Sequence, residues 1–143
     1  TRDTKDTISY KSIPNISACK SLKITSQSPI NYRNEIANKV KADYFISLHC
    51  DGVENLKGDY AVCCYADEKG KELANKVIKH YSLIKGTSKS RTDLGVLKNS
   101  AKNKLLIEFG FMTTPSHMKI LMNNKAILVK NIYTGVSEYI NEN

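Results

Sequence analysis

The 143 residues have the length of one ordinary domain, which can bury a core without help from disulfides. Hydrophobic residues make up 41% of the chain and charged residues 25%, values that are typical of a globular protein and exclude a low-complexity chain. There is no run of 18 apolar residues, so no membrane-spanning helix is predicted, and the first residues lack the apolar stretch of a signal peptide. The net charge of +8 predicts attraction to a polyanion, for which nucleic acid, anionic lipid and teichoic acid all qualify.

A polar segment opens the chain, and helix-like and strand-like patterns follow it. Residues 6–29 are rich in Ser, Thr, Lys and Asn and contain Pro14 and Pro29, so a loop or insertion is predicted there. Apolar residues at helical spacing predict helices, and short apolar runs predict strands. In chain order we expect a helix at 32–40 capped by Asn31, strands at 43–49 and 58–65, a helix opened by Asp67 and reaching Tyr81, a loop at 86–93, strands at 94–97 and 104–108, a short helix capped by Ser116 and ending at Met122, and a helix at 124–139. This succession predicts a layered α/β domain.

The sequence contains four cysteines, none of them in the C-x-x-C spacing of a zinc or redox site: Cys19, Cys50, Cys63 and Cys64. Adjacent side chains of a strand point to opposite faces, so Cys63 and Cys64 are poorly placed to bind one ion together. We interpret all four as structural thiols and predict no disulfide framework.

Two polar residues stand at the ends of predicted apolar strands. His49 comes just before a Cys-Asp-Gly turn, and Glu108 closes a second apolar run just before Gly110. In open α/β sheets, sites form beyond the carboxyl ends of the strands. A carboxyl buried behind apolar residues has a raised pKa unless it is paired, and a general acid or base near neutral pH needs such a pKa. Each residue alone is also typical of a structural role, His49 as a hydrogen-bonded strand end and Glu108 as an ion-pair partner or helix cap.

Several short motifs occur together in a fixed order. They are Thr1-Arg2-Asp3, the R-x-x-x-A-N run of Arg33, Ala37 and Asn38, the run from Ala42 to His49, Gly58, Leu73-Ala74, Leu94-Gly95-Val96-Leu97, and Leu106-Ile107-Glu108-Phe109-Gly110-Phe111. This order and spacing resemble the zinc N-acetylmuramoyl-L-alanine amidase family, the type 3 amidases of autolysins, sporulation enzymes and phage endolysins. The resemblance covers residues 1–3 and most of the chain from residue 31 onward. Its two most specific parts are the strand ending in Ser-Leu-His and the Ile-Glu-Phe-Gly-Phe segment.

The resemblance implies a fold, an activity and a metal. The fold would be a three-layer α/β structure with a mostly parallel sheet flanked by helices, as in phosphorylase/hydrolase-like proteins. Family members hold one Zn²⁺ with two His and one Glu and leave a position open for water. By this resemblance His49 is a metal ligand and Glu108 is the catalytic residue. Zinc would polarise the lactyl amide carbonyl of peptidoglycan, and Glu108 would move a proton from water to the leaving amine of L-alanine. The implied location is extracellular or in the cell wall, and cytoplasmic before release in a phage lysin.

The sequence departs from the family pattern at its start. In the family, a Gly-His motif and a helix with the ligand Glu precede the Thr-Arg that is here Thr1-Arg2. We therefore expect residues 1–143 to form an amidase catalytic domain that is N-terminally incomplete. His80 and His117 match no metal position of the family and are expected at the surface. Three explanations stay open: a processed or truncated piece, a partner segment supplied by another chain, or a homologue that binds the wall without cutting it.

The remaining observations concern the substrate and other binding partners. Asp51 stands where the family usually has Asn, two residues after the zinc His, which affects substrate contacts. Lys89, Arg91 and Asn99 are candidate substrate contacts by loop position alone, and each is equally typical of a solvated loop. Aromatic residues are not interleaved with basic ones, so no nucleic-acid partner is predicted. Peptidoglycan is the expected partner, with anionic wall polymers attracted by the charge. The alternative function is a non-catalytic homologue that binds the wall or a partner protein.

Overall fold

The computed structural model describes residues 28–52 and 60–143. In chain order the described elements are helix α2 (Pro29–Lys39), strand β1 (Tyr44–Asp51), strand β2 (Ala61–Tyr65), helix α3 (Glu68–His80), strand β3 (Gly86–Ser90), the 3-10 helix η2 (Gly95–Leu97), strand β4 (Asn103–Phe111), helix α4 (Pro115–Asn123) and helix α5 (Lys125–Glu142). None of the helices in these two ranges is both long and apolar enough to cross a bilayer. The loop or insertion predicted at 6–29 lies outside the described residues, apart from its last two positions, where α2 begins.

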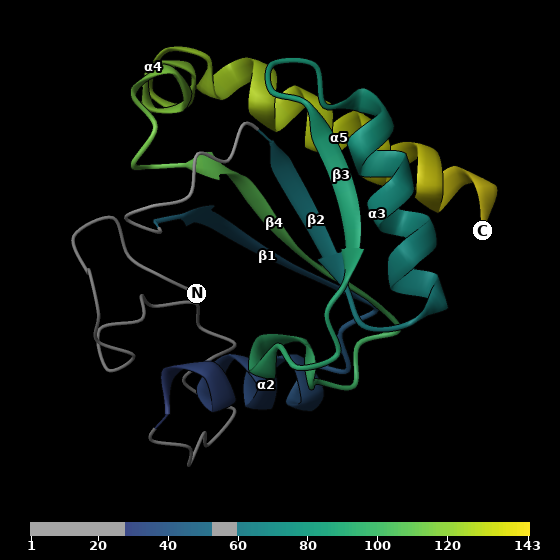
Figure 1. The fold of residues 1–143 in the computed structure, drawn as a ribbon. Coiled ribbons are helices and arrows are strands. Elements are labelled where there is room, and N and C mark those ends of the chain that lie inside the picture. The colour runs from purple at the N-terminus through teal and green to yellow at the C-terminus, as the bar shows by residue number, and fades with distance from the viewer. Residues whose placement is uncertain (1–27, 53–59) are drawn as a thin grey trace.

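Four strands form one sheet in the order β1-β4-β2-β3 (Figure 1). β1 runs parallel to β4 and β2 runs parallel to β3, whereas β2 and β4 are antiparallel. The expectation of a mostly parallel sheet flanked by helices is therefore confirmed, with one antiparallel pairing at its centre. Because β1 and β4 are parallel, their carboxyl ends meet at the same edge of the sheet, where sites form in α/β folds.

Helices on both faces of the sheet make three layers (Figure 1). On one face, α3 and α5 pack over a core in which Leu73 and Leu105 are fully buried. On the other face, Val96 of η2 packs with Leu106 of β4, and η2 contacts α2. The sheet is therefore covered on both faces over β2 and β4, and β4 is its most buried strand.

Two of the cysteines are adjacent in β2, and side chains of a strand alternate between the two faces of the sheet. Cys63 belongs to the core under α3 and α5, and Cys64 belongs to the core under η2, so they point to opposite faces as predicted. Cys50, Cys63 and Cys64 are free thiols. Cys19 lies outside the described residues.

Three helix starts show how proline and capping residues decide where a helix begins. Asp67 caps α3 as predicted, and its carboxylate accepts the backbone N–H of Gly70 at 2.8 Å. The predicted caps Asn31 and Ser116 are wrong, because α2 is capped by Ser28 and α4 begins after Thr114. Both helices have proline in their first turn, where its missing N–H costs nothing, so each starts earlier than the apolar pattern indicated.

The segment from residue 86 to 97 differs most from the prediction. The expected loop contains strand β3, which pairs in parallel with β2 at the edge of the sheet. The expected strand at 94–97 is instead the 3-10 helix η2, with Val96 and Leu97 buried. The sequence of β3 is polar, so backbone pairing with β2 and not an apolar pattern determines its conformation.

A cluster of charged side chains ties α3 to α5. Glu138 of α5 accepts from Lys76 and Lys79 of α3 at 3.0 Å each and also pairs with His80. The hydrogen bonds from His80, Lys76 and Lys79 lower the pKa of Glu138 to about 2. The layer formed by α3 and α5 is therefore held together by ion pairs as well as by apolar packing, so the two helices support the sheet as one unit.

The close approach of α3 and α5 generates the first prediction. A Cβ added at Gly135 would lie 2.6 Å from Cα of Val77 and 2.9 Å from the carbonyl oxygen of Lys76. Gly135→Ala should therefore lower the free energy of unfolding by about 1–3 kcal/mol, the usual cost of overpacking, although Ala is the better helix former by about 1 kcal/mol. Urea unfolding measures the change, with Lys130→Ala on the exposed side of α5 as the control. A Gly135→Ala protein as stable as the parent would contradict this packing.

Candidate active site

The parallel ladder between β1 and β4 places His49 directly opposite Glu108. On the other side of β4, Glu108 is paired with Val62 of β2. Paired residues of neighbouring strands point to the same face of the sheet, and residues two apart on a strand share that face. Leu106 packs in the core under η2, so His49 and Glu108 lie on the face that η2 covers. The two residues predicted from the sequence are thus neighbours at one edge of the sheet.

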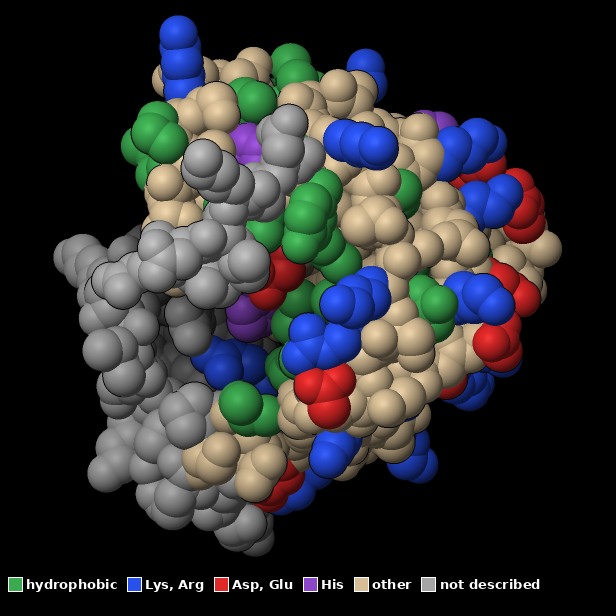
Figure 2. Space-filling model, viewed as in Figure 1, with side chains coloured by type: hydrophobic (Ala, Val, Ile, Leu, Met, Phe, Trp, Pro, Cys, Tyr) green, Lys and Arg blue, Asp and Glu red, His purple; other side chains and the backbone are tan. Residues whose placement is uncertain are grey.

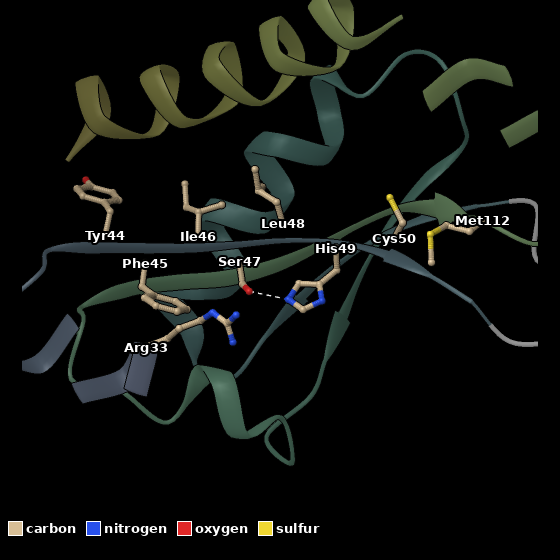
Figure 3. Close-up of a pocket in the computed structure, with 9 residues that line it drawn as sticks. All are labelled: Arg33, Tyr44, Phe45, Ile46, Ser47, Leu48, His49, Cys50 and Met112. Atoms are coloured by element: carbon tan, nitrogen blue, oxygen red, sulfur yellow. Dashed lines mark hydrogen bonds between the residues drawn. The ribbon is translucent and has the colours of Figure 1, made fainter. Parts of the chain in front are cut away.

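A hollow of about 730 Å³ lies beside this edge and is lined by residues 44–50 of β1 with Arg33 of α2 and Met112. Figure 3 shows that Ser47 and His49 extend from the side of β1 that faces Arg33. Figure 2 shows a hollowed part of the surface where histidine, acidic and basic side chains gather. The hollow therefore brings an imidazole and a guanidinium together next to the strand that carries Glu108.

His49 is an exposed side chain whose ring is oriented by its own strand. Its Nε2 lies 2.7 Å from Oγ of Ser47, within hydrogen-bond distance (Figure 3). The sequence analysis missed Ser47, although the period of two in a strand places it on the same face as His49. A hydrogen-bond partner on one ring nitrogen fixes the orientation of an imidazole, as it does in metal-bound histidines.

The Glu108 carboxyl is half-buried and one of its oxygens is unpaired. Within the part of the chain that the structure describes, Oε2 of Glu108 is the one buried side-chain polar atom without a hydrogen-bond partner. Burial, followed by the negative charge of Asp51, raises the pKa of Glu108 from 4.5 to about 7. An unpaired buried polar atom costs about 1–3 kcal/mol, so it needs a functional explanation. A carboxyl with this pKa exchanges protons readily at neutral pH, as a general acid or base must.

A zinc centre needs more ligands than the described residues bring together. Residues 28–52 and 60–143 contain no group of three or more His, Cys, Asp or Glu side chains able to hold a metal ion. His49 is one ligand of the kind that zinc binds, whereas catalytic zinc sites typically use three protein ligands. The described part of the chain therefore does not by itself fit a zinc centre.

Of the other two histidines, His117 differs from its expected surface position. His117 is only 1% exposed, and its Nδ1 accepts the backbone N–H of Phe111 at 3.1 Å. His80 is half-buried in its pair with Glu138. The expectation of a surface position is therefore wrong for His117, whereas His80 stays partly exposed. Only the docking of α4 onto the rest of the domain buries His117, and a polar residue in a short helix gives no signal of that docking.

The three loop residues considered as substrate contacts separate into two kinds. Asn99 is 5% exposed and donates to the carbonyl of Val96 at 3.0 Å, so it has a structural role. Lys89 and Arg91 remain near the surface, and their positive charges oppose the rise in the pKa of Cys64 that burial causes. Cys64 shares the face of Glu108, so these two cations lie on the face of the candidate site.

Known proteins match this chain in sequence and in fold. A family model described as N-acetylmuramoyl-L-alanine amidase matches residues 2–138. The CwlD amidase from Clostridioides difficile in complex with the GerS lipoprotein is 24% identical, with a TM-score of 0.73 over 80% of this chain. An N-acetylmuramoyl-L-alanine amidase from Clostridium difficile 630 is 28% identical, with a TM-score of 0.72 over 80% of this chain. The chain spans 62% and 66% of the lengths of these two structures, which is less than two thirds. No protein of curated function matches it.

The electrostatics of the site generate the second prediction. Because burial is the larger cause and Asp51 the smaller, Asp51→Asn should lower the pKa of Glu108 from about 7 while leaving it above 4.5. In metal-free protein, folded Glu108 keeps a proton that the unfolded chain releases above 4.5, so its contribution to stability falls as pH rises from 4.5 to about 7. Asp51→Asn should narrow the pH range over which this contribution to stability is lost. A carboxyl ¹³C NMR titration measures the pKa, with the exposed Asp43→Asn as the control, and an unmoved Glu108 titration would refute the coupling.

Proposed function

The chain belongs to the N-acetylmuramoyl-L-alanine amidase family, and on that basis we propose that the protein hydrolyses the amide between N-acetylmuramic acid and the L-alanine of the peptidoglycan stem peptide. One observation carries the proposal: Glu108, with a buried unpaired oxygen and a pKa of about 7, lies opposite His49 on the next strand. The 28% identical amidase from Clostridium difficile 630 supports the same reaction.

Glu108 is proposed to carry the proton transfers that amide hydrolysis requires. Water must lose a proton as its oxygen attacks the carbonyl carbon, and the amine of L-alanine must gain one as the C–N bond breaks. With its pKa near neutrality, the Glu108 carboxyl can accept the first proton and donate it to the amine. The products are a stem peptide with a free N-terminus and a glycan strand that retains its lactyl carboxylate.

His49 is proposed as one ligand of a catalytic Zn²⁺. Its ring lies at the hollow and its Nε2 is within hydrogen-bond distance of Ser47, an arrangement that metal-bound histidines share. Zinc, when bound, supplies polarisation of a carbonyl and a lowered pKa for water. The other ligands that such a centre needs would come from outside residues 28–52 and 60–143.

The proposed substrate implies the setting in which the protein works. A peptidoglycan amidase acts outside the cell or in the cell wall, and a phage lysin is cytoplasmic until release. The net charge of +8 supports an electrostatic attraction to anionic wall polymers. Residues 1–143 would form the catalytic domain of this amidase, and the alternative is a homologue that binds the wall or a partner without catalysis.

The third prediction tests catalysis in the whole protein that carries these residues. With Zn²⁺ supplied, purified Gram-positive peptidoglycan should release new N-terminal alanine, and the release should stop with a chelator. Glu108→Gln keeps the size of the side chain but removes its proton transfer, so the rate should fall by about 100-fold or more.

Glu72→Gln is the matched control, because Glu72 is an exposed carboxylate that lies on α3. It should retain the parent rate. If the parent protein is retained on the wall but releases no alanine in either condition, the amidase proposal fails and the non-catalytic alternative is supported.

The fourth prediction concerns the metal. His49→Ala should lower the affinity for Zn²⁺ by more than about tenfold. Removing only the hydrogen-bond partner of a metal ligand typically lowers metal affinity by about tenfold or more, and this substitution removes the ligand itself. Isothermal titration with Zn²⁺ measures the change in the same whole protein. His80→Asn, away from the hollow, should bind Zn²⁺ as the parent does, and equal affinity in the His49 variant would remove His49 from the metal site.

A further inference from the structure

The strand that carries Glu108 is interrupted immediately after it by a β-bulge. His49 pairs with Glu108 and Asp51 pairs with Phe111, so β4 has one more residue than β1 between the two pairs. The ladder resumes beyond the bulge, where the N–H of Met112 donates to the carbonyl of Asp51 at 2.7 Å. A bulge bends its strand and re-aims the neighbouring side chains, and bulges are frequent next to active sites.

Two side chains from other elements hold this bulge by its backbone. The N–H of Phe111 donates to Nδ1 of His117 at 3.1 Å. The hydroxyl of Tyr81 donates to the carbonyl of Phe109 at 2.9 Å. Phe111 and both of these side chains are buried, so water cannot substitute for the bonds at low cost.

The ring of His117 also packs directly on the bulge. Gly110 has a φ of 136°, a conformation that favours glycine. A Cβ added at Gly110 would lie 2.9 Å from Nδ1 of His117 and 3.0 Å from Cδ1 of Ile84. The backbone at Gly110 is thus enclosed by these side chains, and the bulge has little room to slip or relax.

From this geometry we propose that His117 is a positioning residue for the amidase reaction. Its Nδ1 fixes the bulge that follows Glu108, and the fixed bulge holds the Glu108 carboxyl on the face it shares with His49. The inference rests on the proposed function, but the hydrogen bond itself does not. His117 acts through the backbone and has no assigned contact with substrate.

The fifth prediction separates the hydrogen bond from the bulk of the ring. Asn has an acceptor oxygen the same number of bonds from Cα as Nδ1 of His, whereas Leu is a buried side chain without an acceptor. In His117→Leu, the amide of Phe111 should exchange at least about tenfold faster, and kcat should fall by about tenfold or more with KM little changed, because a small misplacement of a reacting group is costly. His117→Asn should restore both quantities toward the parent values.

Gly135→Ala controls for stability, because it should destabilise the fold without contacting the bulge. It should leave kcat unchanged under conditions where it is folded. The proposal is overturned if His117→Leu retains the parent exchange rate and kcat, or if Leu and Asn lower kcat equally.

An inactive parent protein would instead count against the proposed function alone. In that case the amide exchange of Phe111, with the backbone resonances of Glu108 and Gly110, still decides whether His117 holds the bulge. Unchanged resonances and exchange in His117→Leu would refute it, and shifted resonances with rescue by Asn would support it.

Discussion

The parallel pairing of β1 with β4 is the interaction on which the site depends. It places the carboxyl ends of the two strands at one edge of the sheet and sets His49 opposite Glu108 in a single register. A shift of one residue in that register would send one of the two side chains to the opposite face. The apolar residues of β4 resist such a shift, because Leu105 and Ile107 fill the core under α3 and Leu106 fills the core under η2.

The same burial that secures β4 creates the chemistry of Glu108. A carboxyl within a strand that is packed on both faces is partly removed from water, and the nearby charge of Asp51 adds to the effect on its pKa. The fold tolerates the free-energy cost of burying this carboxyl because other contacts hold β4 in place. Beyond Glu108, the bulge is bonded to Tyr81 and His117, which come from the segment after α3 and from α4. The position of Glu108 is therefore decided by three separate parts of the chain.

The layer formed by α3 and α5 supports this arrangement from behind. The close contact of Gly135 with Val77 and the pairing of Glu138 with lysines of α3 make the two helices one rigid support. Among the described residues, the opposite layer consists of the shorter elements α2 and η2. One face of the sheet thus carries the two long helices, and the other carries the side chains of His49 and Glu108.

The sequence by itself determined the layered α/β class and the existence of the two strands that carry His49 and Glu108, because apolar runs and chain order are local properties. The expected burial holds for β4 alone, since no residue of β1 is fully buried. It also indicated the family, through motifs in a fixed order. Only the tertiary structure decided the pairing of those residues, the pKa of Glu108, the strand at Gly86–Ser90 and the buried role of His117. Each of these depends on contacts between segments far apart in the chain. Hydrophobic patterning does not encode such contacts, since a polar residue looks the same in sequence whether it is solvated or enclosed.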